Sequence, residues 1–143
     1  MRGMQRRSVL LALALLGCGG GAPSRLHTLG KPKGTGEVDF QVENRTAAIV
    51  NNLYVTESER VRSASREALQ AGTAEQAALW GDDRLRSGLE SGGKVRVTIP
   101  KPGSYDVRAV DRDGREQHVA NLRLAAGGRY VLELEEGGWR APR

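Results

Sequence analysis

The sequence has little of the residue types that usually carry chemistry: among 143 residues there are one cysteine, two histidines and only two tryptophans, three tyrosines and one phenylalanine. A single cysteine excludes an internal disulfide, so a hydrophobic core alone has to hold any folded domain. Four nitrogen or sulfur ligands for zinc are not available. The chain also lacks a Gly-x-Ser-x-Gly elbow and the Walker and Rossmann glycine motifs. We therefore expect no catalytic residue and no cofactor.

Long apolar runs are absent as well. The longest extends from Ser8 to Leu16, about half the length that a membrane-spanning helix needs. Basic Arg2, Arg6 and Arg7 precede it, and Leu15-Leu16-Gly17-Cys18 follows it. A basic segment, then an apolar segment, then small residues is the order of a secretory signal.

The stretch Leu15-Leu16-Gly17-Cys18 resembles the lipobox of bacterial lipoproteins. The resemblance implies that residues 1–17 are a signal peptide and that the Cys18 thiol carries a diacylglyceryl group. Two or three acyl chains anchor a protein permanently to a membrane. Gly19 in place of Asp implies the outer membrane of an envelope that has one. Arg6-Arg7 also resembles a twin-arginine export signal, so the export route stays open, as does the alternative that Cys18 is a chance residue.

Removal of residues 1–17 changes the charge balance. The whole chain has 22 basic and 17 acidic residues, and three of the arginines lie in the signal, which leaves a net charge of +2. The remaining Lys and Arg are scattered among acids and show no basic stripe with interleaved aromatics. We therefore expect no nucleic-acid partner.

The rest of the chain is predicted to form a tether and one domain. Residues 18–36 are rich in glycine and contain two prolines, which is typical of a flexible tether in which His27 is a solvated bystander. Residues 37–139 suit a single domain, and residues 140–143 form a C-terminal tail.

Period-two alternation of apolar and polar residues dominates this domain and predicts β-strands with one wet face. The expected strands cover residues 37–43, 47–56, 94–99, 104–110, 115–124 and 129–135. Asp111-Arg112-Asp113-Gly114 predicts a tight hairpin, and residues 125–128 a second one. A short helical insertion is expected at about 60–80, where residues 73–76 have capping-box spacing. The fold class is thus all-β, an antiparallel immunoglobulin-like sandwich of about seven strands.

Several short motifs resemble small β-sandwich domains of bacterial envelopes: Leu53-Tyr54-Val55-Thr56, Trp80-Gly81-Asp82-Asp83, and Tyr105 to Gly114. The chain departs from that pattern by a longer segment before Trp80. The resemblance implies a fold and supplies no reaction.

Two groups of residues are candidate sites. Trp80, Asp82 and Asp83 form a recognition surface, or Trp80 caps one end of the sandwich while Asp82 caps a turn, and we favour the second interpretation. Asp111 and Asp113 are weak candidates for calcium ligands, although Asp-x-Asp-Gly is also a good turn. His118 shares strand parity with Ala120, Leu122 and Leu124 and is expected to be semi-buried.

The sequence therefore favours a lipid-anchored envelope protein with a non-catalytic β-sandwich that binds an envelope protein or glycan. Two alternatives stay open. One is an enzyme or enzyme accessory that acts on cell-wall material through Trp80, Asp82 and Asp83, and the other is a purely structural envelope protein.

Overall fold

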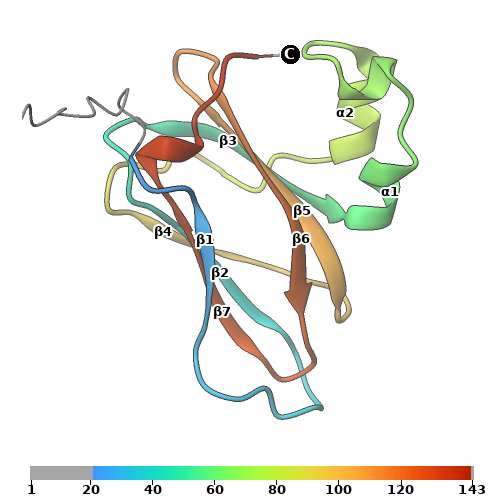
Figure 1. Cartoon of the computed structure of the whole chain (residues 1–143), viewed down its shortest axis with the longest axis vertical. Helices are drawn as coiled ribbons and strands as arrows, with labels where there is room; N and C mark the ends of the chain where they lie inside the picture. The colour runs from blue at the N-terminus through green and yellow to red at the C-terminus, as the bar shows by residue number, and fades with distance from the viewer. Residues whose placement is uncertain (1–20, 143) are drawn as a thin grey trace, which may run out of the picture.

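Two β-sheets pack face to face in the computed structural model, which describes residues 21–142 (Figure 1). Cys18 and the signal sequence lie outside the described residues. The first sheet has the strand order β1-β7-β2-β4 and the second the order β3-β5-β6. No helix in the described part of the chain has the length and apolar character to cross a membrane.

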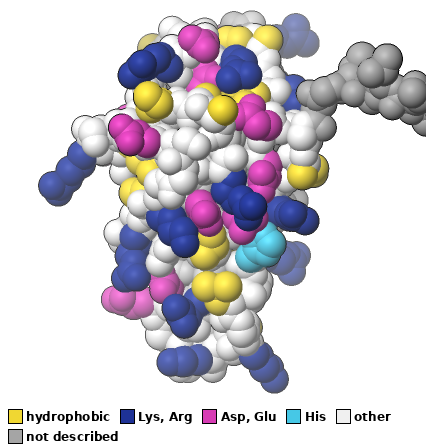
Figure 2. All heavy atoms as spheres, turned by 90° about the vertical axis from the view of Figure 1, so that its left-hand side faces the viewer, with side chains coloured by type: hydrophobic (Ala, Val, Ile, Leu, Met, Phe, Trp, Pro, Cys, Tyr) yellow, Lys and Arg dark blue, Asp and Glu magenta, His cyan; other side chains and the backbone are white. Residues whose placement is uncertain are grey.

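The first sheet contains β1 (Arg25–Thr28), β7 (Arg129–Leu134), β2 (Asp39–Asn44) and β4 (Lys94–Val97). Alternation is strict in β2, where Phe40, Val42 and Asn44 are fully buried and the residues between them are partly exposed. On the outer face, acidic and basic side chains alternate and form cross-strand ion pairs (Figure 2). This confirms the predicted wet face.

The strand β1 corrects the predicted tether. Arg25–Thr28 pairs antiparallel with β7, and Leu26 packs against the core. Further along, the Gly34 amide donates to the Ala126 carbonyl at 3.0 Å. The prediction of a flexible tether is therefore wrong for residues 25–28, and the domain begins before residue 37. A four-residue strand that pairs with a partner about a hundred residues away leaves no local periodicity to recognise.

One strand pairing and one turn differ from the predicted antiparallel sandwich. β2 and β7 run parallel, with Phe40 opposite Tyr130 and Val42 opposite Leu132. Residues 125–128 do not close a hairpin, because β6 and β7 belong to different sheets. That turn instead carries the chain across the sandwich.

The second sheet contains β3 (Val50–Glu57), β5 (Gly103–Asp111) and β6 (Glu116–Leu124). The inner faces of the two sheets share one core, whose buried residues are Phe40, Val42, Val50, Leu53, Val55, Leu89, Val97, Ile99, Tyr105, Val107, Ala109, Leu122, Leu124, Tyr130, Leu132, Leu134 and Trp139. The all-β sandwich of seven strands is therefore confirmed.

A β-bulge in β6 corrects the predicted parity of His118. Val119 pairs with Val107 but Leu122 pairs with Tyr105, so Ala120 and Asn121 together face a single residue of β5. Asn121 has φ of 59°, a left-handed conformation that Asn tolerates. The extra residue inverts the alternation, so that Gln117 is buried while His118 and Ala120 are exposed.

The predicted helical insertion is present. It consists of α1 (Ser58–Arg62), η1 (Glu67–Leu69) and α2 (Ala74–Trp80), which follow β3 and lie beside the outer face of the second sheet (Figure 1). Ala68, Leu79 and Trp80 form a second small core there, against Tyr54 of β3. A final short helix, η2 (Glu136–Gly138), follows β7.

Candidate functional site

The helix α2 places Trp80 over the second sheet. The Thr73 hydroxyl accepts a hydrogen bond from the Gln76 amide at 3.0 Å, and the Gln76 side chain accepts one from the Gly72 amide at 3.0 Å. The two bonds fix the start of the helix at the predicted residues 73–76, although Gln76 binds the amide of Gly72 and not that of the N-cap residue Thr73. Trp80, the last residue of α2, is 5% exposed. Its ring packs edge to face against the His118 ring, with 5.4 Å between the ring centroids.

The structure therefore does not present Trp80, Asp82 and Asp83 as one exposed recognition surface. Trp80 is buried, and Asp83 is a structural residue of the adjacent loop. One Asp83 oxygen accepts hydrogen bonds from the amides of Leu53 and Leu85, at 2.9 and 3.0 Å, and the other from the Asn52 side chain at 2.8 Å. Of the three, Asp82 alone is fully exposed. Trp80 thus has a structural role, but on the outer face of the second sheet and not at an end of the sandwich, and the loop contacts come from Asp83 and not from Asp82.

A buried carboxylate, Asp106 of β5, organises the polar groups near Trp80. Its Oδ2 lies 2.6 Å from His118 Nε2. Its Oδ1 accepts hydrogen bonds from the Ser58 hydroxyl at 2.6 Å and from the Asn121 amide at 3.0 Å. The carboxylate thus joins α1, β5 and the bulge of β6, and these contacts offset the cost of burying its charge.

Serine, aspartate and histidine meet here, but not in the order that nucleophilic catalysis requires. In a catalytic triad the serine hydroxyl donates to histidine, and the carboxylate holds the other ring nitrogen. Ser58 instead donates to Asp106 and is 2% exposed. The arrangement orients the His118 ring and leaves the serine without access to a substrate.

Next to His118, Arg108 of β5 forms an ion pair with Glu116 of β6. The Arg108 guanidinium also lies over the Tyr54 ring, 5.2 Å from its centre. Both charged side chains are mostly buried, with 12% and 16% of the side chain exposed. Because burial reduces solvent screening, this pair fixes both side chains more firmly than a surface pair would.

These side chains line two hollows on the outer face of the second sheet. One of about 370 Å³ lies between α2 and strands β3 and β5, with Asn52, Tyr54, Thr73, Gln76, Trp80 and Arg108 in its lining. A smaller one of about 40 Å³ lies beside it and is lined by Leu69, Gln76, Trp80, Arg108, Glu116 and His118. We call the five side chains of Tyr54, Trp80, Arg108, Glu116 and His118 the outer-face cluster.

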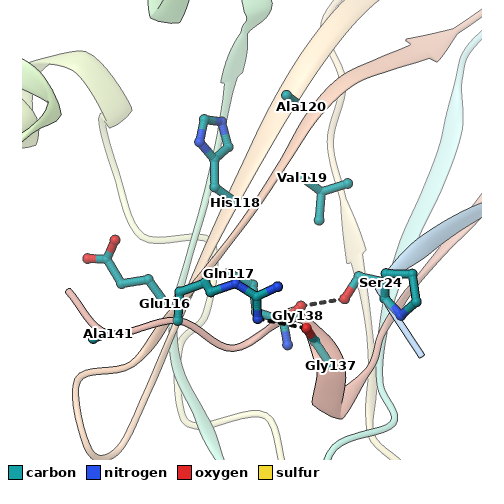
Figure 3. Close-up of a pocket in the computed structure, with 11 residues that line it drawn as sticks. Ser24, Glu116, Gln117, His118, Val119, Ala120, Gly137, Gly138 and Ala141 are labelled. Carbon is teal, nitrogen blue, oxygen red and sulfur yellow. Dashed lines mark hydrogen bonds between the residues drawn. The ribbon is translucent and has the colours of Figure 1, made fainter. Parts of the chain in front are cut away.

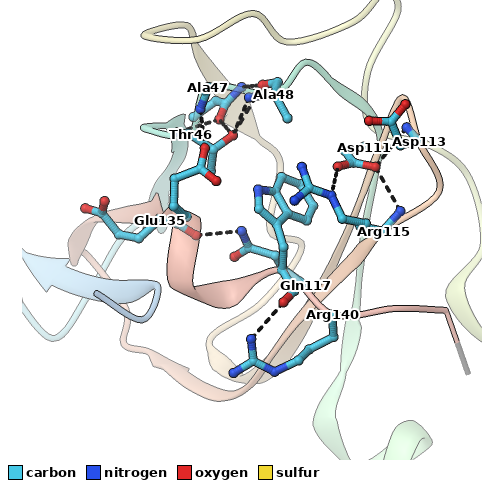
Figure 4. A network of polar contacts seen from close by, with 12 residues as sticks. Thr46, Ala47, Ala48, Asp111, Asp113, Arg115, Gln117, Glu135 and Arg140 are labelled. Atoms are coloured by element: carbon cyan, nitrogen blue, oxygen red, sulfur yellow. Dashed lines mark hydrogen bonds and ion pairs between the residues drawn. The ribbon is translucent and has the colours of Figure 1, made fainter. Parts of the chain in front are cut away.

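Asp111 and Asp113 build the turn between β5 and β6 (Figure 4). Asp111 Oδ1 accepts from the amides of Asp113 and Arg115 at 2.9 and 2.8 Å, and its Oδ2 accepts from the Arg115 side chain at 2.7 Å. Gly114 closes the turn with φ of 83°, a conformation that favours glycine. Within residues 21–142, no group of three or more His, Cys, Asp or Glu side chains is placed to hold a metal ion.

Sequence reasoning missed the outer-face cluster. The one available signal was the paired alternation of β5 and β6, which places Asp106 and Arg108 on one face of the sheet with Glu116 and His118 opposite. The bulge and the approach of α2 could not be read from that alternation. Comparison of the chain with family models, with curated proteins and with solved structures found no match.

Proposed function

We propose that this protein is a lipid-anchored component of a bacterial envelope, whose immunoglobulin-like β-sandwich binds another envelope component without catalysing a reaction. The anchor rests on the signal-like order of residues 1–17 and on the lipobox at Cys18. A four-stranded sheet packed on a three-stranded one has the strand numbers of a constant-type immunoglobulin domain, which supports the finer fold assignment.

The observation that carries the binding proposal is the position of β6. Its side chains Glu116 and His118 line a hollow on the α2 side, and the same two residues help to line a groove of about 420 Å³ along the free edge of the strand. Concave surfaces with a few oriented polar groups are the usual form of binding sites. The contacts of Asp106 and Arg108 hold these groups in place before any partner arrives.

The contacts of Asp83 favour binding over the enzyme alternative. Hydrolysis by paired carboxylates needs two groups that face one cleft. Both carboxylate oxygens of Asp83 accept hydrogen bonds from Asn52, Leu53 and Leu85, so Asp83 is not free to act with Asp82 on a substrate.

The anchor is tested by the intact mass of the protein extracted from membranes of its native host, with Cys18→Ser as the matched variant. The expected species begins at Cys18 and carries two or three acyl chains, and the variant carries none. An unmodified chain beginning at Met1 or Met4 would refute the anchor.

The binding part is tested by cross-linking in intact cells. A photo-reactive amino acid replaces exposed Ala77 beside the α2 hollow or Ala120 on β6, and a control replaces exposed Arg96 on the other sheet. We expect a defined adduct from Ala77 or Ala120 that Arg96 does not give. Equal or absent adducts at all three positions would remove the support for a binding function.

A further inference from the structure

Among the sheet edges, β6 is the long one that the described chain leaves uncovered. The edge strands β1 and β4 have four residues each. The nine-residue β6 pairs on its outer side only at Glu116, with Arg140. Proteins normally shorten, charge or cover such edges, because free amides and carbonyls recruit another strand.

The edge of β3 shows how this chain covers an edge. There the loop over residues 83–89 takes up the outward groups. The Arg84 amide donates to the Leu53 carbonyl at 2.7 Å, and Val50 and Leu89 exchange two hydrogen bonds. No such segment follows β6 beyond Glu116 in the part of the chain that the structure describes.

Strand alternation identifies the free groups of β6. Glu116 and Arg140 exchange two hydrogen bonds of 2.8 Å, so the main-chain groups of Glu116 point away from β5. Those of His118 point the same way, because alternate residues of an antiparallel strand bond to the same side. The Ala120 amide also points away from β5, because it lies across a trans peptide from the carbonyl of Val119, which pairs with Val107 before the bulge begins. Arg140 therefore pairs with the edge of β6 at Glu116, and the next main-chain groups along this edge that could bind another strand belong to His118 and Ala120.

The groove beside this edge is lined from two parts of the chain (Figure 3). One wall is β6 from Glu116 to Ala120, and the other is formed by Pro23 and Ser24 with Gly137 and Gly138 of η2. Since strands pair at about 4.8 Å and this groove has a second wall, a single extended chain fits it better than the edge of a second folded domain.

The charges around the groove favour an acidic occupant. Glu116 is already paired with Arg108. The Arg140 guanidinium donates to the carbonyls of Gly137 and Trp139, at 2.8 and 2.7 Å, and no carboxylate of residues 21–142 pairs with it. Exposed Arg123 lies toward the other end of β6, and no described acidic side chain pairs with it either.

We propose that the groove beside β6 binds an extended, acidic polypeptide segment of an envelope partner, which joins the β3-β5-β6 sheet as a fourth strand. Strand addition gives affinity through main-chain hydrogen bonds to His118 and Ala120. Arg140 in the groove lining, and Arg123 three residues beyond the Ala120 end of that lining, select acidic side chains. The inference rests on the proposed binding function and names its partner class.

The test uses the full chain in detergent micelles and a random peptide library displayed on phage. Peptides selected on the protein are synthesised, and their affinities are measured for the wild type, Ala120→Pro and Arg96→Pro. Both prolines remove an outward-facing amide from a strand edge, on β6 and on β4 respectively. Arg96 is the matched control. Because the Asn44 amide donates to the Gly93 carbonyl, the main-chain groups of Val95 and Val97 point toward β2. Those of Arg96 therefore point away from β2, toward the free edge of β4.

We expect selected peptides rich in Asp and Glu, an affinity loss of about tenfold or more in Ala120→Pro, and no change in Arg96→Pro. Amide hydrogen exchange on the wild type provides a second measurement that does not depend on the variant's folding. Bound peptide should slow exchange at His118 and Ala120. Peptides without acidic enrichment, or protection confined to the α2 hollow, would overturn the proposal.

Failure here and failure of the proposed function are distinguishable. If no peptide binds at β6 while Ala77 still gives a specific adduct in cells, strand addition is refuted and the binding function stands. If neither Ala77 nor Ala120 gives an adduct in cells, the binding function fails with it.

Discussion

His118 Nε2 lies 2.6 Å from Asp106 Oδ2, across the two paired strands β5 and β6. Asp106 also accepts from Ser58 and from the bulged Asn121, so one carboxylate ties the helical insertion to the sheet. Its 3% exposure means that water contributes little to its solvation. The stability of this region therefore depends on the hydrogen bonds from His118, Ser58 and Asn121 to this carboxylate.

Replacing this carboxylate tests that dependence. We expect Asp106→Ala to lower the free energy of unfolding by about 3 kcal/mol, because buried Ser58 loses its acceptor and the bulge loses its anchor. Urea denaturation measures the change. Asp82→Ala, which removes a carboxylate from an exposed position, serves as the control and should change stability by less than about 0.5 kcal/mol. Equal effects of the two variants would contradict the role of Asp106.

Trp80 provides a second prediction. Because it is buried between α2 and the sheet, Trp80→Ala should cost about 3–5 kcal/mol through the lost packing and the cavity that is left. Trp80→Phe keeps an aromatic ring against His118 and should cost less. Thermal unfolding of both variants measures the difference. A Trp80→Ala protein as stable as the wild type would return Trp80 to the exposed recognition surface that the sequence allowed.

The parts of the fold that alternation encodes could be predicted from the sequence. The six strands from β2 to β7, the helix capped at Thr73 and the turn at Asp111 all depend on residues close together in the chain. The pairing of β1 with β7 and the parallel pairing of β2 with β7 depend on residues about a hundred positions apart. Local pattern contains no information on such contacts, and for this reason the sequence predicts a tether where β1 forms.

For the site, the limit of sequence reasoning is the bulge. A single inserted residue at Ala120–Asn121 moves His118 from the core side to the outer face. Asn is uncommon in strands, but the residue type alone does not show that Asn121 has a positive φ or that the strand bulges there. The outer-face cluster depends on this shift, and so its members could be found in the sequence one by one but not as a group.

The turn after β5 yields a third prediction. Asp111→Ala should lower stability by about 2 kcal/mol, because the partly buried amides of Asp113 and Arg115 lose their acceptor, the buried Asp111 carboxylate. Asp113→Ala is the matched control, since that side chain is exposed, and it should change stability little. Melting temperatures with and without calcium complete the test. We expect calcium to leave the melting temperatures unchanged. The structural role would be contradicted if calorimetry showed calcium binding tighter than millimolar and Asp113→Ala abolished that binding.

The last prediction concerns the pH dependence of β1 docking. Glu133 Oε2 of β7 lies 3.0 Å from His27 Nε2 of β1 and 3.1 Å from Arg45 Nη1. Burial acts to raise the pKa of Glu133, but the charges of Arg45 and His27 and their hydrogen bonds outweigh it and hold that pKa below its ordinary value. A carboxylate with a lowered pKa in the folded state contributes stability above its unfolded pKa, and that contribution is lost as the pH falls through the folded value.

The free energy of unfolding of the wild type should therefore decline between about pH 5 and about pH 3. Glu133→Gln should be less stable near neutral pH and should show a shallower acid decline, because it has no proton to take up. Glu37→Gln, at an exposed position without an ion-pair partner among the described residues, is the control and should follow the wild type. Urea titrations across this range measure all three proteins. Parallel acid limbs for the wild type and Glu133→Gln would show that this contact does not hold β1 in the sheet.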